Sequence, residues 1–212
     1  MRKTAIFWDN DGVLVDTEVL YYEANGQVLA GLGVELTVEQ FREFYLKDTI
    51  GGWHLAAGLS AAEVEEKRSE RNRVYSELLR TRSFAVPGAA DVLAALSGRL
   101  TTGVVTSSRR DHFDLIHART GFGGFFEFVV SCDDVRNTKP DPESYLRALE
   151  ISGRSPAECV AVEDSERGLA AAKAAGLECW VIPTGLSRDG DFRAADRILS
   201  GIAEIPALLE IR

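Results

Sequence analysis

The feature that most constrains this chain is the alternation of short apolar runs with segments of helical periodicity. The runs are rich in Val, Ile and Phe, and each is bounded by polar residues or by Gly and Pro, as in buried parallel strands. They are Ala5 to Trp8, Leu100 to Val105, Phe125 to Val130, Cys159 to Val162 and Cys179 to Ile182. Helical periodicity lies between them at Ala89 to Leu96, Asp111 to Arg119, Glu143 to Ile151 and Leu169 to Ala175. This alternation predicts an α/β fold, with a doubly wound Rossmann-like parallel sheet.

One interval, from Thr17 to Ser83, breaks this rhythm. It carries apolar residues at three- and four-residue spacing among charges, which is typical of amphipathic helices. The helical stretches are Val19 to Leu32, Val38 to Leu46 and Ala61 to Leu79. We therefore expect a small all-helical domain at residues 17–83, inserted into a Rossmann-like core made of residues 1–16 and 84–212.

Composition restricts the classes of partner. The chain has 24 basic and 33 acidic residues, a net charge of −9, which would repel a phosphate backbone. The longest run without charged residues, 49–62, is too short to cross a bilayer, and no secretory signal pattern is present at the start. We expect a cytoplasmic protein that binds neither nucleic acid nor membrane. Its 3 cysteines are far apart, so they indicate neither a disulfide framework nor a zinc site.

Polar residues follow the predicted strands, and in an open α/β sheet the ligand lies outside the carboxyl ends of the strands. One further residue, Lys139, lies in a loop just before a predicted helix. The residues that follow the strands are Asp9 and Asp11, then Thr106, Ser107 and Ser108, and finally Glu163 and Asp164. Separate segments thus deliver carboxylates, hydroxyls and one ammonium group to the same edge.

Carboxylates gathered in this way require a cation, because unit charges about 4 Å apart cost roughly 4 kcal/mol at a dielectric constant of 20. An oxygen-only set of ligands favours Mg²⁺. Phosphate chemistry follows, since Mg²⁺ and Lys139 would neutralise phosphoryl oxygens and Thr106 would donate to them. One aspartate could attack phosphorus while the other acts as acid and base, a role worth about 10²–10⁴ in rate.

Four short motifs carry a resemblance to a known family. They are Asp9-Asn10-Asp11-Gly12-Val13-Leu14-Val15-Asp16-Thr17, Val104-Val105-Thr106-Ser107-Ser108, Lys139-Pro140-Asp141-Pro142 and Val162-Glu163-Asp164-Ser165. With these motifs in order, the chain resembles the haloacid dehalogenase superfamily of phosphohydrolases. The similarity is to its helical-cap branch, which includes phosphoglycolate phosphatase and β-phosphoglucomutase.

The resemblance implies a role for each matching residue. Asp9 would be the nucleophile that becomes aspartyl phosphate, and Asp11 the general acid and base. The phosphoryl group would be held by Thr106, Ser107 and Lys139. Magnesium would be held by Asp9, the carbonyl of Asp11, Glu163 and Asp164. The inserted helical segment would be a mobile cap that excludes water and reads the substrate.

Further residues are candidates for substrate contact. Ser108 and Arg109 follow the second motif, and Trp53 lies in a cap loop beside Gly51. Arg71, placed before Tyr75, resembles the cap lysine of the mutase branch. A different pair, His112 and His117, is five residues apart, which is off the i, i+4 spacing of a helical metal pair. These two histidines are expected to be surface or core-edge residues.

The favoured function is a Mg²⁺-dependent phosphatase for a small phosphorylated metabolite of the sugar phosphate or phosphoglycolate type. A β-phosphoglucomutase-like sugar phosphate mutase is the alternative. Mutases of this family resemble one another in holding a second phosphate with an arginine of a cap loop, and here no arginine occurs between Arg42 and Arg68. Tyr21 also stands where that branch carries histidine, so the mutase is less favoured. A phospho-accepting signalling domain would need neither Asp11 nor the helical insertion. Halide removal is disfavoured because that branch lacks an aspartate at the place of Asp11. The particular substrate and the oligomeric state are left open.

Overall fold

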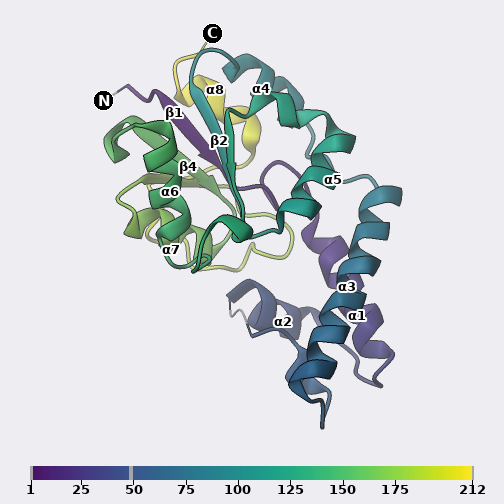
Figure 1. The fold of residues 1–212 in the computed structure, drawn as a ribbon. Coiled ribbons are helices and arrows are strands. Elements are labelled where there is room, and N and C mark those ends of the chain that lie inside the picture. The colour runs from purple at the N-terminus through teal and green to yellow at the C-terminus, as the bar shows by residue number, and fades with distance from the viewer. Residues whose placement is uncertain (1, 48–49, 212) are drawn as a thin grey trace. The chain divides into compact units, whose positions relative to one another are not determined.

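The computed structural model of the chain describes residues 2–47 and 50–211. It divides into two compact units, one made of residues 1–16 and 85–212 and the other of residues 17–84. The first unit contains the sheet, and the second is helical (Figure 1). Within the described part of the chain, no helix combines the length and the apolar character needed to span a membrane.

The first unit is built on a six-stranded sheet in which every neighbouring pair of strands is parallel, in the order β3-β2-β1-β4-β5-β6. The strands are β1 (Ala5–Trp8), β2 (Thr101–Val105), β3 (Phe128–Val130), β4 (Cys159–Glu163), β5 (Glu178–Val181) and β6 (Arg197–Ile198). This order places β1 in the middle, between β2 and β4. The predicted fold class, a doubly wound parallel sheet with a helical insertion, is confirmed.

Alternation along β1 explains why helices cover both faces of the sheet. Ala5 and Phe7 point into one apolar cluster, and Ile6 and Trp8 into another, so successive side chains serve opposite layers. The first cluster includes residues of α6 (Glu143–Ser152) and α7 (Glu166–Ala174), and the second includes residues of α4 (Ala89–Leu96), α5 (Arg110–Thr120) and α8 (Ile205–Leu208). A strand buried on both faces must be apolar throughout, which is why β1 could be recognised in the sequence.

In the sheet of the first unit, strands β3 and β6 differ from the prediction. The apolar run at Phe125 to Val130 was predicted as one strand, but β3 begins at Phe128 and Phe122–Phe125 form a 3₁₀ turn. This turn contains two consecutive glycines, which favour a tight turn over an extended strand. The other difference is β6, which sequence analysis missed because two residues are too few to show periodicity.

The helical unit consists of α1 (Glu18–Ala30), α2 (Val38–Phe41) and the long helix α3 (Ala61–Thr81). The predicted helix at Val38 to Leu46 is split, since α2 continues as a π-helical stretch over Arg42–Lys47. Thr37 and Ser60 begin α2 and α3 with capping boxes, in which the side chain accepts from a backbone N–H three residues later. The hydroxyl side chains of Thr37 and Ser60 thus stabilise the first turns of α2 and α3.

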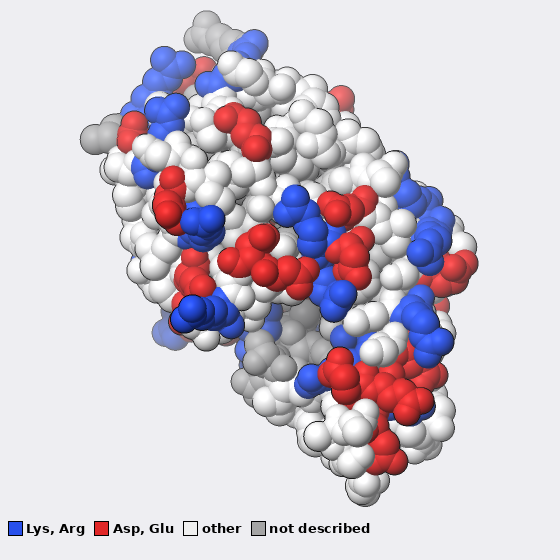
Figure 2. Space-filling model, viewed as in Figure 1, with Lys and Arg blue, Asp and Glu red and all other residues white. Residues whose placement is uncertain are grey.

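Charged residues of both signs are interspersed over the face drawn in Figure 2. Ion pairs one helical turn apart, such as Arg110 with Asp114 at 3.4 Å and Arg147 with Glu150 at 2.5 Å, are part of the protein surface. Exposed pairs of this kind contribute only about 0–1 kcal/mol each to stability. The fold therefore depends on the two apolar clusters more than on its surface charges.

Candidate active site

The sheet order brings the predicted polar residues of the core to one edge. Because β1 lies between β2 and β4, the segments that leave these three strands at their carboxyl ends are neighbours. Asp9 directly follows β1, Thr106 follows β2, and Glu163 is the last residue of β4. Lys139 reaches the same edge from the loop before α6, and it contacts Asp9 and Glu163.

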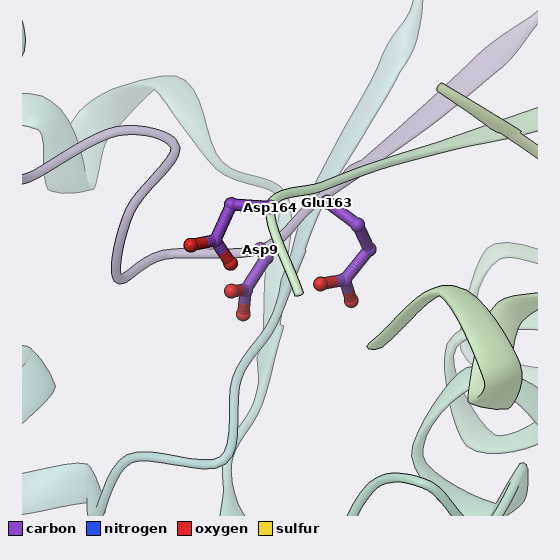
Figure 3. A group of neighbouring side chains, drawn as sticks. All are labelled: Asp9, Glu163 and Asp164. Carbon is purple, nitrogen blue, oxygen red and sulfur yellow. The ribbon is translucent and has the colours of Figure 1, made fainter. Parts of the chain in front are cut away.

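Three of these side chains form an acidic cluster. Oxygens of Asp9, Glu163 and Asp164 lie within 4.8 Å of one another, and Figure 3 shows the three carboxylates side by side at the strand ends. All three residues are buried, with exposed fractions of 8%, 0% and 1%. Such a cluster is costly unless positive charge accompanies it.

Two glycines make room for this cluster. A Cβ at Gly12 would lie 2.2 Å from Oδ2 of Asp164, and a Cβ at Gly168 would lie 1.8 Å from Oε2 of Glu163. Gly12 also has a φ of +85°, a conformation that other residues rarely adopt. The acidic side chains therefore pack directly against backbone, and any side chain at these glycines would displace them.

Lys139 supplies positive charge inside the protein. Its Nζ donates to Oδ1 of Asp9 at 2.8 Å, to Oε1 of Glu163 at 2.6 Å and to the carbonyl of Val105 at 2.8 Å. Burial by itself would lower the pKa of Lys139, but the carboxylates of Asp9 and Glu163 outweigh burial and raise it. Oε1 of Glu163 also accepts from the hydroxyl of Tyr145, so one carboxylate oxygen is fixed from two sides.

The electrostatics of Asp9 differ from those of an ordinary aspartate. Burial raises its pKa to about 7, the charges of Glu163 and Asp11 add to this effect, and Lys139 opposes it. A dication in the cluster would act in the same direction as Lys139 and favour the charged carboxylate. The site thus holds Asp9 near the boundary between its two protonation states.

Asp11, two residues after Asp9, is held by donors that converge on its Oδ2. Ser108 Oγ donates at 2.8 Å, Asn10 Nδ2 at 3.2 Å and Thr106 Oγ1 at 3.4 Å. The same Thr106 hydroxyl accepts from the backbone N–H of Ser108 at 3.0 Å. The segment after β2 thus orients the carboxylate that follows β1.

The residues present fit a hard divalent cation such as Mg²⁺. The cluster offers only oxygen ligands, which Mg²⁺ prefers. In addition, Oε2 of Glu163 is buried without a hydrogen-bond partner, which is costly for a carboxylate oxygen unless an ion engages it. Nearby, the buried Ser107 Oγ also has no partner, and it is suited to donate to an anionic ligand.

The remaining predicted substrate residues lie in different surroundings. Arg109 is exposed and forms a two-pronged ion pair with Asp111, with both contacts at 3.0 Å. Trp53 is buried in the helical unit, where its ring lies against Gly51. Roles of these residues toward substrate stay predictions.

Arg71 is also buried in the helical unit, with 9% of its surface exposed. Its guanidinium donates to the hydroxyl of Tyr21 and to Oδ1 of Asn25, the latter at 3.1 Å, and it lies 4.5 Å from the centre of the Tyr21 ring. These contacts tie α3 to α1. They give Arg71 a structural role in this unit, whatever it does toward substrate.

Sequence reasoning missed or misplaced several residues near the site. His112 and His117 were expected at the surface or the edge of the core; both are buried, each with 5% exposed, which excludes the surface. His117 Nε2 lies 2.8 Å from Oδ1 of Asn10, a residue that was quoted in a motif and given no role. Tyr145, which bonds Glu163, was also missed. Only Asn10 gave a signal in the sequence, as a polar residue at the end of an apolar strand.

Taken together, the fold and the site define a class of enzyme. A buried aspartate at the carboxyl edge of a parallel sheet, paired with a lysine and accompanied by a second aspartate, is suited to accept a phosphoryl group and pass it on. The chain belongs to the haloacid dehalogenase-like hydrolases, whose family model matches residues 3–176. The predicted family is thus confirmed.

Individual relatives agree with this assignment. The protein CbbY of Rhodobacter capsulatus is 33% identical, with 92% of each chain covered. The phosphorylated carbohydrates phosphatase of Thermotoga maritima is 34% identical over 82% of each chain. Among solved structures, a variant of CbbY from Rhodobacter sphaeroides in complex with xylulose-(1,5)-bisphosphate has a TM-score of 0.83 and 28% identity, with 96% of each chain covered. The predicted enzyme class, a phosphatase of this family, is confirmed as well.

Proposed function

We propose that this chain is a Mg²⁺-dependent phosphatase that hydrolyses a small phosphorylated carbohydrate through an aspartyl-phosphate intermediate. The observation that carries the proposal is the buried carboxylate of Asp9, which pairs with Lys139 at 2.8 Å and belongs to an acidic cluster with Glu163 and Asp164. Relatives whose names or complexes concern phosphorylated carbohydrates support the substrate class.

In the first step, a carboxylate oxygen of Asp9 forms a bond to phosphorus while the bond from phosphorus to the sugar oxygen breaks. The carboxyl group of Asp11 gives its proton to that oxygen, so the sugar leaves as an alcohol. Thr106, Ser107 and Lys139 hold the oxygens of the phosphoryl group. The hydroxyl of Ser107, buried without a partner, supports this assignment.

In the second step, a water molecule attacks the phosphorus of aspartyl phosphate. The new bond from water oxygen to phosphorus forms as the bond from phosphorus to Asp9 breaks, which restores the Asp9 carboxylate. The proton lost by the water passes to Asp11, which is then ready for the next substrate. One carboxyl group thus serves as acid and then as base, and no other proton carrier is required.

Positive charge is needed in both steps, because the phosphoryl oxygens and the acidic cluster repel one another. When bound, Mg²⁺ would be held by Asp9, the carbonyl of Asp11, Glu163 and Asp164, and it would supply charge that neutralises the phosphoryl oxygens. Lys139 contributes a second positive charge from within the protein. Its bonds to Asp9 and Glu163 keep that charge beside the reacting atoms.

The test is phosphate release from a panel of sugar phosphates, sugar bisphosphates and phosphoglycolate, with Mg²⁺ and with a chelator. The native protein is compared with Asp9→Asn and Asp11→Asn. Asp91→Asn, a change at an exposed aspartate on α4, is the matched control. Acid-quenched protein from the same reactions is assayed for phosphate bound to the chain.

We expect release to need both Mg²⁺ and Asp9, and Asp11→Asn to slow it by about 10²–10⁴-fold. A sugar monophosphate or bisphosphate should be the best substrate of the panel. Full activity in Asp9→Asn or in chelator would overturn the proposal. So would transfer of the phosphoryl group to a second hydroxyl of the sugar with little free phosphate, because that is the mutase reaction.

A further inference from the structure

A continuous line of hydrogen bonds, buried at its centre and partly buried at its two ends, connects the end of α5 to the second aspartate of the site. Thr120 Oγ1 lies 3.0 Å from Nδ1 of His117, and Nε2 of His117 lies 2.8 Å from Oδ1 of Asn10. Nδ2 of Asn10 then lies 3.2 Å from Oδ2 of Asp11. All of these residues belong to the unit that contains the sheet.

The partners fix the direction of every bond in this line. Because the Asp11 carboxylate only accepts, the amide nitrogen of Asn10 must face it, and the amide oxygen therefore faces His117. His117 must then carry its proton on Nε2 and accept at Nδ1 from the hydroxyl of Thr120. The Thr120 oxygen accepts in turn from the backbone N–H of Phe122 at 3.2 Å.

The surroundings of His117 hold the ring in this arrangement. The ring centre lies 4.2 Å from that of Phe113, 5.5 Å from Phe126 and 6.0 Å from Phe122. Burial lowers the pKa of His117 to about 4, against the opposing charges of Asp11 and Asp114. A neutral ring with one N–H is the form that the line of bonds requires.

An asparagine at position 10 is difficult to explain by packing alone. The residue is fully buried, at 0% exposed, and it is the second residue after the apolar strand β1. An apolar side chain would fill the same space without the cost of removing an amide from water. Both ends of the amide are used, one on His117 and the other on Asp11.

We propose that Asn10 and His117 are positioning residues that orient the acid and base carboxylate of Asp11. This inference rests on the proposed function, in which Asp11 protonates the leaving oxygen and later takes a proton from water. Asn10 and Ser108 donate to Oδ2 of Asp11, and the transferred proton is carried on Oδ1. Without His117, the amide of Asn10 can turn, and the Asp11 carboxylate is then held by Ser108 with no donor from Asn10.

The reaction offers a way to separate positioning from folding, because its two steps need Asp11 differently. With an alkyl phosphate, Asp11 must protonate the leaving oxygen. With 2,4-dinitrophenyl phosphate, the leaving phenolate departs without a proton, so formation of aspartyl phosphate does not need Asp11. Hydrolysis of aspartyl phosphate needs Asp11 in both cases.

The experiment compares the native protein with His117→Phe, Asn10→Leu, the double variant and His117→Gln, all with Mg²⁺ present. The double variant removes both buried polar groups together, which preserves stability better than leaving one unpaired. His117→Gln keeps an N–H donor for Asn10. His112→Gln, at a second buried histidine of α5, is the matched control.

We expect the two single variants and the double variant to lose about 10- to 100-fold in kcat for the alkyl phosphate, with KM unchanged. With 2,4-dinitrophenyl phosphate, their first turnover should keep its native rate while the later turnovers slow, giving a burst of phenolate. His117→Gln should recover most of the loss, and His112→Gln should show none of it.

The inference is overturned if folded His117→Phe or the folded double variant keeps native kcat with the alkyl phosphate. It is equally overturned if the first turnover of 2,4-dinitrophenyl phosphate falls in step with the alkyl reaction, since a general loss of structure would do that. Failure of the proposed function looks different. In that case the native protein itself shows no phenolate release that depends on Asp9.

Discussion

Replacing Asp9 with asparagine should stabilise the metal-free protein above neutral pH while abolishing its activity. The substitution keeps the shape of the side chain and an oxygen that can accept from Lys139. It removes a negative charge that is buried and lies near two other carboxylates, Glu163 and Asp164. The charged form of Asp9, which catalysis requires, therefore destabilises the folded protein. Removing the charge removes this cost of burial and of repulsion from the neighbouring carboxylates.

The magnitude follows from the pKa of Asp9, which burial raises from 3.8 to about 7 in the folded protein. A pKa difference of about three corresponds to roughly 4 kcal/mol, at about 1.4 kcal/mol for each tenfold change. The folded-state pKa of Asp9 lies above the unfolded-state value, so protonation of Asp9 favours the folded state. This contribution to the free energy of unfolding is fully present below about pH 4 and is lost as pH rises through 7. About 3 kcal/mol of it should be lost between pH 5 and pH 8.

The assay is urea denaturation in a chelating buffer at pH 5 and pH 8, followed by circular dichroism. Asp9→Asn should be more stable than the native protein at pH 8, and the difference should shrink by about 3 kcal/mol at pH 5. Asp91→Asn, at an exposed aspartate of α4, should follow the native pH dependence. Adding Mg²⁺ at pH 8 should stabilise the native protein more than Asp9→Asn. Parallel pH dependence of the native protein and Asp9→Asn would refute the reasoning.

Further substitutions test the packing around the site and in the helical unit. Gly12→Ala should raise the Mg²⁺ concentration needed for half-maximal activity, because its Cβ would lie 2.2 Å from Oδ2 of Asp164 and would displace that carboxylate. An unchanged Mg²⁺ titration would count against this. Tyr145→Phe should cost about 1.5–3 kcal/mol in urea denaturation, since Glu163 loses a charge-assisted hydrogen bond; native stability would contradict the expectation. Arg71→Met should cost about 1–3 kcal/mol, because the buried Asn25 and the half-buried Tyr21 on α1 lose their donor. A stability equal to that of the native protein would show that these bonds are dispensable.

The strands that are covered by helices on both faces could be predicted from the sequence, because they stand out as apolar runs. Strand β1 is apolar along its whole length, and β4 is apolar up to its last residue, Glu163. The two-residue strand β6 carries no such pattern and was missed. Turn-forming glycines likewise shortened β3 relative to its apolar run.

Much of the candidate site was predictable for a related reason. Polar residues that follow the apolar runs of a parallel sheet lie at one edge, so Asp9, Glu163 and Asp164 could be placed together before their positions were known. The distances among them needed the structure. That Lys139 bonds two carboxylates and a backbone carbonyl at once was also beyond reach, because its partners are up to 130 residues away.

The sequence by itself determined the fold class, the helical insertion and the residues at the carboxyl edge, since each depends on patterns within a few residues of the chain. Only the tertiary structure decided which buried polar groups meet. Packing of α5 against the sheet brings His117 to Asn10 across 107 residues and joins two side chains that had been given no functional role into a line of bonds ending at Asp11. No local pattern records such a pairing, because a buried hydrogen bond is specified by the geometry of the packed elements and not by spacing along the chain.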